Sequence, residues 1–203
     1  MLDSSPMNTN ILGVAAASIL IGLLLGFFAV PQMFSDGRMG SVDMRGSTNM
    51  DRHFIEEMIP HHEGAIAMAE LALEKSRRPE ILSLAAGIIE AQTREISDMT
   101  AWYQSWFGTA VPVDSTGAMG GMGHGAGMQM MGMEGDIETL AAAKDFDLEF
   151  LKQMIPHHEM AIMMARMLDA GTTRSEMKTL ADAIITSQSR EIEMMRSWLT
   201  AWY

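Results

Sequence analysis

The chain has 203 residues, of which 23 are methionine and none is cysteine, and its formal net charge at pH 7 is -12. Because so acidic a chain repels phosphate groups, the composition argues against nucleic acid as a partner. The length is enough for one domain with a hydrophobic core and attached segments, and the absence of cysteine fits an oxidising or a metal-exposed compartment.

The N-terminal region predicts a membrane anchor. Residues 1–10 form a short tail, and residues 11–30 follow as ILGVAAASILIGLLLGFFAV, without a charged side chain. At about 1.5 Å per residue, a helix of this length spans the roughly 30 Å hydrocarbon layer. The alternative is a cleaved signal peptide, but no Lys or Arg precedes the run, and signal cores are shorter, about 7–15 residues. Three basic residues follow the span, so the positive-inside rule alone places the rest of the chain in the cytoplasm: Arg38, Arg45 and Arg52.

An internal duplication organises the rest of the chain. The segment Asp51–Ala69 matches Asp147–Ala165 at 12 of 19 positions, and Ile88–Trp102 matches Ile184–Trp198 at 8 of 15, with a constant offset of 96. The predicted order is therefore a tether over residues 31–49, a first unit over 50–107, a Met- and Gly-rich linker over 108–135 and a second unit over 136–203.

Each unit predicts two helices. In the second unit Ala170-Gly171 ends the first helix, and residues 173–176 (Thr-Arg-Ser-Glu) form a capping box for the next, whereas Pro79 begins the second helix of the first unit. One hairpin cannot cover its own apolar stripe, but two hairpins packed together can. The sequence therefore predicts an all-α protein with a four-helix bundle made of two duplicated hairpins, plus the N-terminal transmembrane helix.

The repeated stretch Met-Ile-Pro-His-His-Glu indicates where the chemistry lies. At about 100° per residue, both histidines of each copy fall within the apolar arc that faces the bundle interior: His61 and His62, then His157 and His158. The second helix of each unit carries polar residues inside its apolar stripe, namely Gln92 and Glu95, then Gln188 and Glu191. A buried carboxylate needs a partner, so we expect each glutamate to pair with a facing histidine, which orients the ring and leaves its other nitrogen free.

Imidazole and thioether groups without a thiol are the ligands of a soft ion, which favours Cu(I), with Ag(I) as its mimic. Zinc more often brings cysteine or carboxylate, and a di-iron bundle needs Glu-x-x-His motifs that these helices lack. Two alternatives stay open. One is an accessory subunit of a membrane complex with a purely structural His/Glu core, and the other, less favoured, is an oxidoreductase. Nothing resembles a nucleophile with its base or a phosphate-binding loop, so no enzymatic activity is expected.

Other methionines form two further groups. Met160, Met163 and Met167 fall on the face opposite the core, where they bind soft metal or bury against a partner or the linker, whereas Met99 and Met195 are expected in the core. Residues of the Gly-rich linker are predicted to form weak, exchangeable Cu(I) sites: Met119, Met122, His124, Met128, Met130, Met131 and Met133.

Two copies of M-I-P-H-H-E-x-A-I-x-M-A, each followed by Q-x-R-E-I-x-x-M-x-x-W, resemble the bacterial domain-of-unknown-function family 305 over about residues 50–107 and 145–203. The resemblance implies an exported, ferritin-like helical bundle that binds Cu(I) or Ag(I) through methionine and histidine. Carried over by motif, the ligand candidates are Met58, His61, His62, Met68, Met154, His157, His158 and Met164.

The family resemblance also bears on location. Its extracytoplasmic habit implies that the domain lies outside the cytoplasm, against the positive-inside rule. The anchor distinguishes this chain from a soluble secreted member. It points to a fixed partner in the membrane, such as a copper-containing oxidase complex.

Overall fold

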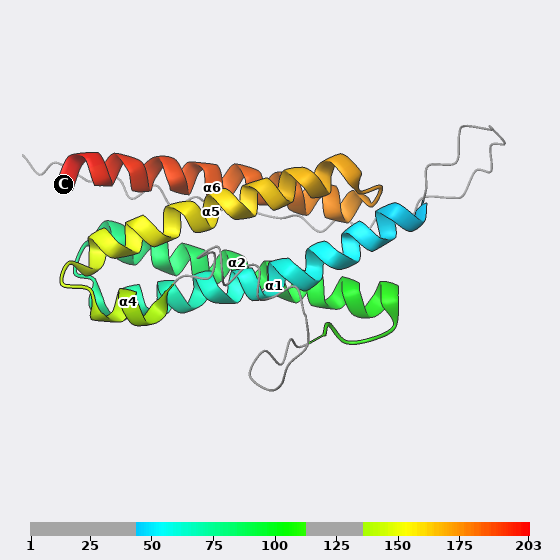
Figure 1. Ribbon diagram of the computed structural model, residues 1–203, viewed down its shortest axis with the longest axis horizontal. Helices are drawn as coiled ribbons and strands as arrows, with labels where there is room; N and C mark the ends of the chain where they lie inside the picture. The colour runs from blue at the N-terminus through cyan, green and yellow to red at the C-terminus, as the bar shows by residue number, and fades with distance from the viewer. Residues whose placement is uncertain (1–43, 113–135) are drawn as a thin grey trace, which may run out of the picture. The chain divides into compact units, whose positions relative to one another are not determined.

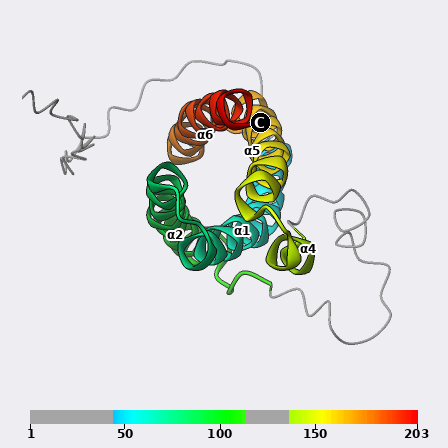
Figure 2. The same cartoon turned by 90° about the vertical axis from the view of Figure 1, so that its left-hand side faces the viewer.

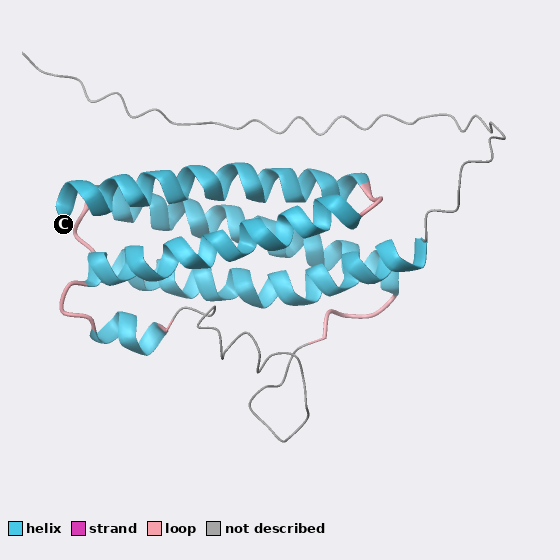
Figure 3. Ribbon diagram, turned by 45° about the horizontal axis from the view of Figure 1, so that its top comes forward, coloured by secondary structure: helices cyan, strands magenta, loops and turns pink. Residues whose placement is uncertain are grey.

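The computed structural model describes residues 44–112 and 136–203, and regular structure within these residues is helical (Figures 1 and 3). Helix α1 spans Met44–Lys75 and α2 spans Pro79–Phe107. A short helix α4 spans Ile137–Ala142, and α5 (Phe146–Gly171) and α6 (Ser175–Trp202) complete the chain. The all-α prediction is confirmed, and α4 is an element that the sequence analysis did not anticipate.

The four long helices form a bundle of two hairpins. Helix α1 packs on α2, α5 packs on α6, and the hairpins meet mainly where α1 packs on α5. The view along the helices shows them placed around a common axis (Figure 2). The predicted four-helix bundle of duplicated hairpins is therefore confirmed, whereas its ferritin-like character stays a prediction.

Two apolar clusters fill the bundle, one towards each end. The first apolar cluster contains Met68, Ile81, Phe150, Met154 and Met195, among others, and the second contains Phe54, Met58, Met99, Tyr103 and Met177. Equivalent residues of the two repeats lie in different clusters. Phe54, Met58 and Met99 lie in the second apolar cluster, and their counterparts Phe150, Met154 and Met195 lie in the first apolar cluster. Met99 and Met195 are fully buried, as predicted. Each of α1 and α5 thus passes from one apolar cluster to the other.

The helix ends agree only partly with the sequence. Pro79 begins α2, as predicted, and Gly108 ends it at a φ of 69°, a left-handed conformation that glycine adopts without steric cost. The predicted capping box before α6 is wrong, because the cap residue is Arg174 and no side chain caps that helix. The Thr173 hydroxyl is instead hydrogen-bonded to Ser47 of α1 at 3.0 Å, so a contact between the hairpins replaces the local one.

Two Arg–Asp–Trp clamps join the hairpins. Arg174 binds Asp51 of α1 at 3.2 Å, and its guanidinium lies 4.0 Å from the ring centre of Trp106. The duplication repeats this clamp: Arg78 binds Asp147 of α5 at 3.2 Å and lies 4.1 Å from the ring of Trp202. Each arginine precedes the second helix of its own hairpin and contacts an aspartate of the other, so the clamps fix how the hairpins meet.

The boundaries of the predicted segments change at one place. Helix α1 begins at Met44, so residues 44–49 of the predicted tether are helical. The predicted tail, the anchor at 11–30, most of the tether and the metal-ligand candidates of the linker lie outside the described residues. Within residues 44–112 and 136–203, no helix combines the length and the apolar character needed to cross a membrane.

Candidate metal centre

A polar layer separates the two apolar clusters in the middle of the bundle. The exposed fractions of His61, His62, His157 and His158 are 5%, 0%, 3% and 0%. Gln92 and Gln188 are also buried, and Glu95 and Glu191 are half-buried. Because all four histidines are buried, the prediction that both histidine pairs face the interior is confirmed. Helices α1, α2, α5 and α6 all contribute polar side chains to this layer.

Two of the four imidazoles are held by carboxylates. His62 Nε2 lies 2.7 Å from Glu95 Oε2, and His158 Nε2 lies 2.6 Å from Glu191 Oε2. A carboxylate accepts a hydrogen bond from an imidazole N–H, so Nε2 is the donor in each pair and Nδ1 faces away from the carboxylate. In both rings Nδ1 is buried without a hydrogen-bond partner. The predicted Glu–His pairing is confirmed for these two histidines. Each of them keeps one buried ring nitrogen without a hydrogen-bond partner.

The other two imidazoles contact each other instead of a carboxylate. The ring centres of His61 and His157 are 3.7 Å apart, with an angle of 40° between the ring planes. Both nitrogens of each ring are buried and lack a hydrogen-bond partner. Each unsatisfied buried polar group costs about 1–3 kcal/mol, so this central pair destabilises the bundle unless something else binds the nitrogens. The ring centres of His62 and His158 lie 6.3 Å from those of their sequence neighbours, His61 and His157.

The central pair is uncharged at neutral pH. Burial, with a smaller contribution from the nearby His62 and His158, lowers the pKa of His61 to about 3. Burial and the neighbouring His61 likewise place the pKa of His157 well below its ordinary value of 6.5. A neutral imidazole keeps a lone pair for a metal ion, so no proton has to leave before the ion binds.

These pKa values predict a pH dependence of stability for the metal-free protein. As the pH falls below 6.5, the unfolded chain protonates both histidines, whereas the folded bundle resists protonation because the pKa of His61 is lowered to about 3 and that of His157 is also well below 6.5. Stability is then lost on acidification, at about 1.4 kcal/mol per pH unit for each histidine. Urea unfolding at several pH values in this window measures the slope. The variant His61→Leu/His157→Leu is expected to lose this part of the slope, and an unchanged slope contradicts the assignment.

The methionine candidates divide by distance along their helices. Met58 and Met154 are fully buried and precede His61 and His157 by three residues, so they lie on the same helix face one turn away. Met68 is also buried, but it follows His61 by seven residues, about 10 Å along the axis, and lies in the first apolar cluster. Met164 has the same position in α5 and is only partly buried. By helix spacing, Met58 and Met154 lie about one turn from His61 and His157 along their own helices, whereas Met68 and Met164 lie about two turns from them.

The two halves differ at the position that follows the motif. Gly64 lies beside the central pair, because a Cβ added to it would stand 3.6 Å from His157 Nε2. The corresponding residue of α5 is Met160, which is half-buried. The two halves therefore differ here, because α1 carries a glycine in contact range of the central pair where α5 carries a thioether.

Two of the three methionines predicted on the face opposite the core lie where the sequence placed them, whereas Met160 is half-buried. Met163 and Met167 are 48% and 61% exposed on α5, on the side away from the apolar clusters. Within residues 44–112 and 136–203, no group of three or more His, Cys, Asp or Glu side chains converges to hold a metal ion.

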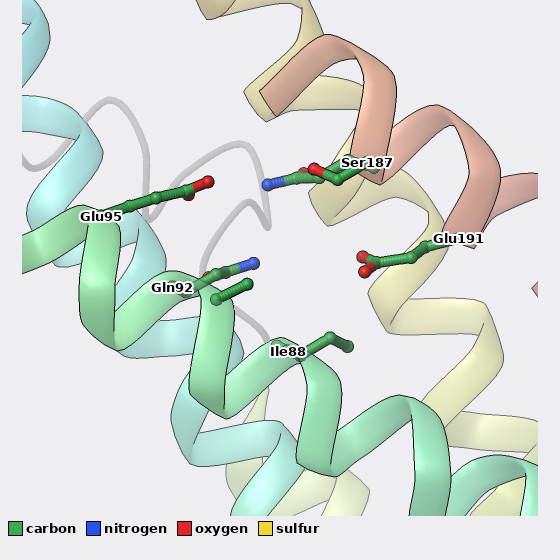
Figure 4. A pocket seen from close by; sticks show the side chains of 7 residues that line it. Ile88, Gln92, Glu95, Ser187 and Glu191 are labelled. Carbon is green, nitrogen blue, oxygen red and sulfur yellow. The ribbon is translucent and has the colours of Figure 1, made fainter. Parts of the chain in front are cut away.

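A cleft lies between α2 and α6, and the glutamine and glutamate side chains of the polar layer line it. Its walls include three pairs of residues related by the duplication: Ala91 and Ser187, Gln92 and Gln188, Glu95 and Glu191. The glutamates of the two helices project into this cleft from opposite sides (Figure 4). Gln92 and Gln188 each keep an amide oxygen that is buried without a partner.

The sequence matches the domain-of-unknown-function family DUF305 over residues 51–201. This match includes both hairpins and every residue of the polar layer. The chain belongs to the DUF305 family.

Solved DUF305 structures share this fold. The Cu(I)-bound form of CopM is 48% identical, with a TM-score of 0.65 over 75% of this chain and 97% of that chain. CopM has also been solved in a Cu(II)-bound and a silver-bound form, and the comparison of this chain with these forms gives TM-scores of 0.66 and 0.64. A DUF305 fragment from Deinococcus radiodurans is 28% identical, with a TM-score of 0.63 over 76% of this chain and 98% of the fragment.

A curated relative matches over a shorter segment. Uncharacterized protein L153 of Acanthamoeba polyphaga mimivirus is 45% identical over 53 residues, which are 26% of this chain. The matched segment covers 35% of the length of that relative.

Several features of this DUF305 chain were missed by the sequence analysis. The Arg–Asp–Trp clamps left a signal, because Asp51, Arg78 and Trp106 all recur after 96 residues as Asp147, Arg174 and Trp202. The contact between His61 and His157 left none, since it depends on how α1 crosses α5. The role of Gly64 is visible in sequence only as a difference between the halves.

Proposed function

We propose that this DUF305 chain binds Cu(I), with Ag(I) as a mimic, in the polar layer of the bundle and buffers or hands over the ion without catalytic turnover. The observation that carries this proposal is the central pair, in which His61 and His157 hold four unpartnered ring nitrogens in contact with each other. A layer built only for stability would satisfy these atoms with hydrogen bonds.

The donor set favours a soft monovalent ion. The layer offers the neutral imidazoles of His61 and His157 and the unpartnered Nδ1 atoms of His62 and His158, and the buried thioethers of Met58 and Met154 lie one helical turn from His61 and His157. Such ligands suit Cu(I) and Ag(I) better than harder ions. Glu95 and Glu191 bring negative charge next to the layer through their imidazole partners, which offsets the charge of an incoming cation. CopM, which is similar over nearly its whole length, has been solved in forms with these metals.

The remaining candidates fit weaker, exchangeable binding. The exposed thioethers of Met163 and Met167, together with the methionines and His124 of the linker, are proposed to capture and release ions outside the bundle. Met160 is half-buried on α5, two residues after His158.

We further propose that residues 11–30 anchor the domain to a membrane, on the extracytoplasmic side. The uncharged run of the sequence supports an anchor. A fixed position suits transfer to a copper-containing complex in the same membrane. Purification in mild detergent tests this, because a stoichiometric partner that contains copper supports it and a lone chain counts against it.

Anaerobic titration of the protein with Cu(I) against a strong chromophoric chelator tests the metal proposal. We expect at least one site that competes with the chelator, and Ag(I) is expected to displace the bound copper. A stoichiometry near zero contradicts the proposal and favours the structural His/Glu core of an accessory subunit.

A further inference from the structure

The cleft between α2 and α6 is lined by the two glutamates that bind imidazoles of the polar layer. The four imidazoles are at most 5% exposed, whereas the side chains of Glu95 and Glu191 are 16% and 18% exposed. Each glutamate binds an imidazole with one carboxylate oxygen while it lines the cleft. The carboxylates therefore bridge the surface and the buried rings.

Other directions into the layer are blocked by packed side chains. The first and second apolar clusters fill the bundle on either side of the layer along the helix axes. Helix α1 packs on α2 and on α5, and α5 packs on α6, which closes three sides. A hydrated cation would have to cross apolar packing in any of these directions, at a high cost in free energy.

We propose that Cu(I) or Ag(I) enters and leaves the polar layer through the α2–α6 cleft, with Glu95 and Glu191 as the groups that first attract the ion. This proposal rests on the proposed function and adds a route to it. Two carboxylates at one opening raise the local concentration of a cation, and polar walls replace part of its hydration. Because the duplication places one glutamate on each wall, the same opening serves both hairpins.

The absence of cysteine from the chain allows a direct test. Ser187→Cys provides a single thiol on the cleft wall, which is alkylated after folding with maleimides of increasing size. The rates of Cu(I) uptake and release are then measured by stopped-flow exchange with a chromophoric chelator. We expect both rates to fall together, by about ten-fold or more with the largest adduct, while the equilibrium affinity stays unchanged.

Two further variants make the result specific. Ala91→Cys places the same adduct on the opposite wall and is expected to act likewise. Ala101→Cys is the matched control, since Ala101 is exposed on α2 and does not line the cleft, so its adduct is expected to leave both rates unchanged. Circular dichroism of each adduct verifies that the bundle is folded, and fully alkylated samples are compared so that no free thiol binds copper.

The outcomes separate this proposal from the proposed function. Wild-type rates in both cleft adducts, with wild-type affinity, overturn the route but leave the metal site intact. Faster release with unchanged uptake also overturns it, because the adduct then distorts the layer instead of closing a path. If the unmodified protein binds no copper, the proposed function fails and the route fails with it.

Discussion

Replacing His61 and His157 together with leucine is expected to abolish tight Cu(I) binding without destabilising the metal-free bundle. The substitution removes the two rings that contact each other, and with them all four unpartnered nitrogens. We expect the affinity to fall by at least about 100-fold, or about 2.7 kcal/mol. Replacing unsatisfied polar groups with apolar ones of similar shape is neutral or stabilising, so unfolding of the metal-free variant in urea is expected at the same or a higher denaturant concentration.

This pair of results distinguishes a metal centre from a structural core. A structural role predicts the reverse, with a large loss of stability and no change in metal binding. His53→Leu is the matched control, because His53 lies on the same helix but is exposed, next to Glu57. It is expected to leave both copper affinity and stability near wild-type values. Wild-type affinity in the double leucine variant would remove the central pair from the site.

Arg174→Ala is expected to destabilise the protein by about 3 kcal/mol, more than the equivalent change Arg78→Ala. Both substitutions remove one clamp between the hairpins, but they leave different partners behind. The side chain of Asp51 is 0% exposed, whereas that of Asp147 is 16% exposed. An unpaired carboxylate without access to water costs more than one that water can reach, so the two equivalent substitutions are expected to differ.

Urea unfolding followed by circular dichroism measures both values. The double variant Asp51→Ala/Arg174→Ala is expected to recover part of the loss, because it removes the unpaired charge as well as the interaction. Equal losses for Arg174→Ala and Arg78→Ala, or no recovery in the double variant, would show that Asp51 is not the source of the cost. The stacking of each arginine on its tryptophan is nearly the same at both ends, so it does not explain a difference.

For the histidine motif, the helical period of the sequence was enough to predict which side chains face the core. Helical spacing placed His61, His62, His157 and His158 on the inner face, and the structure agrees. Spacing also put Met160, Met163 and Met167 outside; Met163 and Met167 are exposed, whereas Met160 is half-buried. These statements depend only on the geometry of one helix, which the sequence specifies residue by residue.

The same reasoning did not identify the partners across helices. It paired the glutamates with the histidines as a group, whereas the structure gives them only to His62 and His158. It also expected a capping box at residues 173–176, but Thr173 binds Ser47 from the other hairpin. The local capping motif did not form because the Thr173 hydroxyl is hydrogen-bonded to Ser47, which is distant in the sequence.

The sequence by itself determined the duplication, the four helices, the inward face of the histidines and the soft character of the donors. Each of these follows from repetition or from the period of a single helix. The tertiary structure alone decided that His61 meets His157, that the glutamates bind His62 and His158, and that a cleft lies between α2 and α6. The physical reason is that a helix period fixes the direction of a side chain, whereas the atom it meets depends on the crossing and register of another helix.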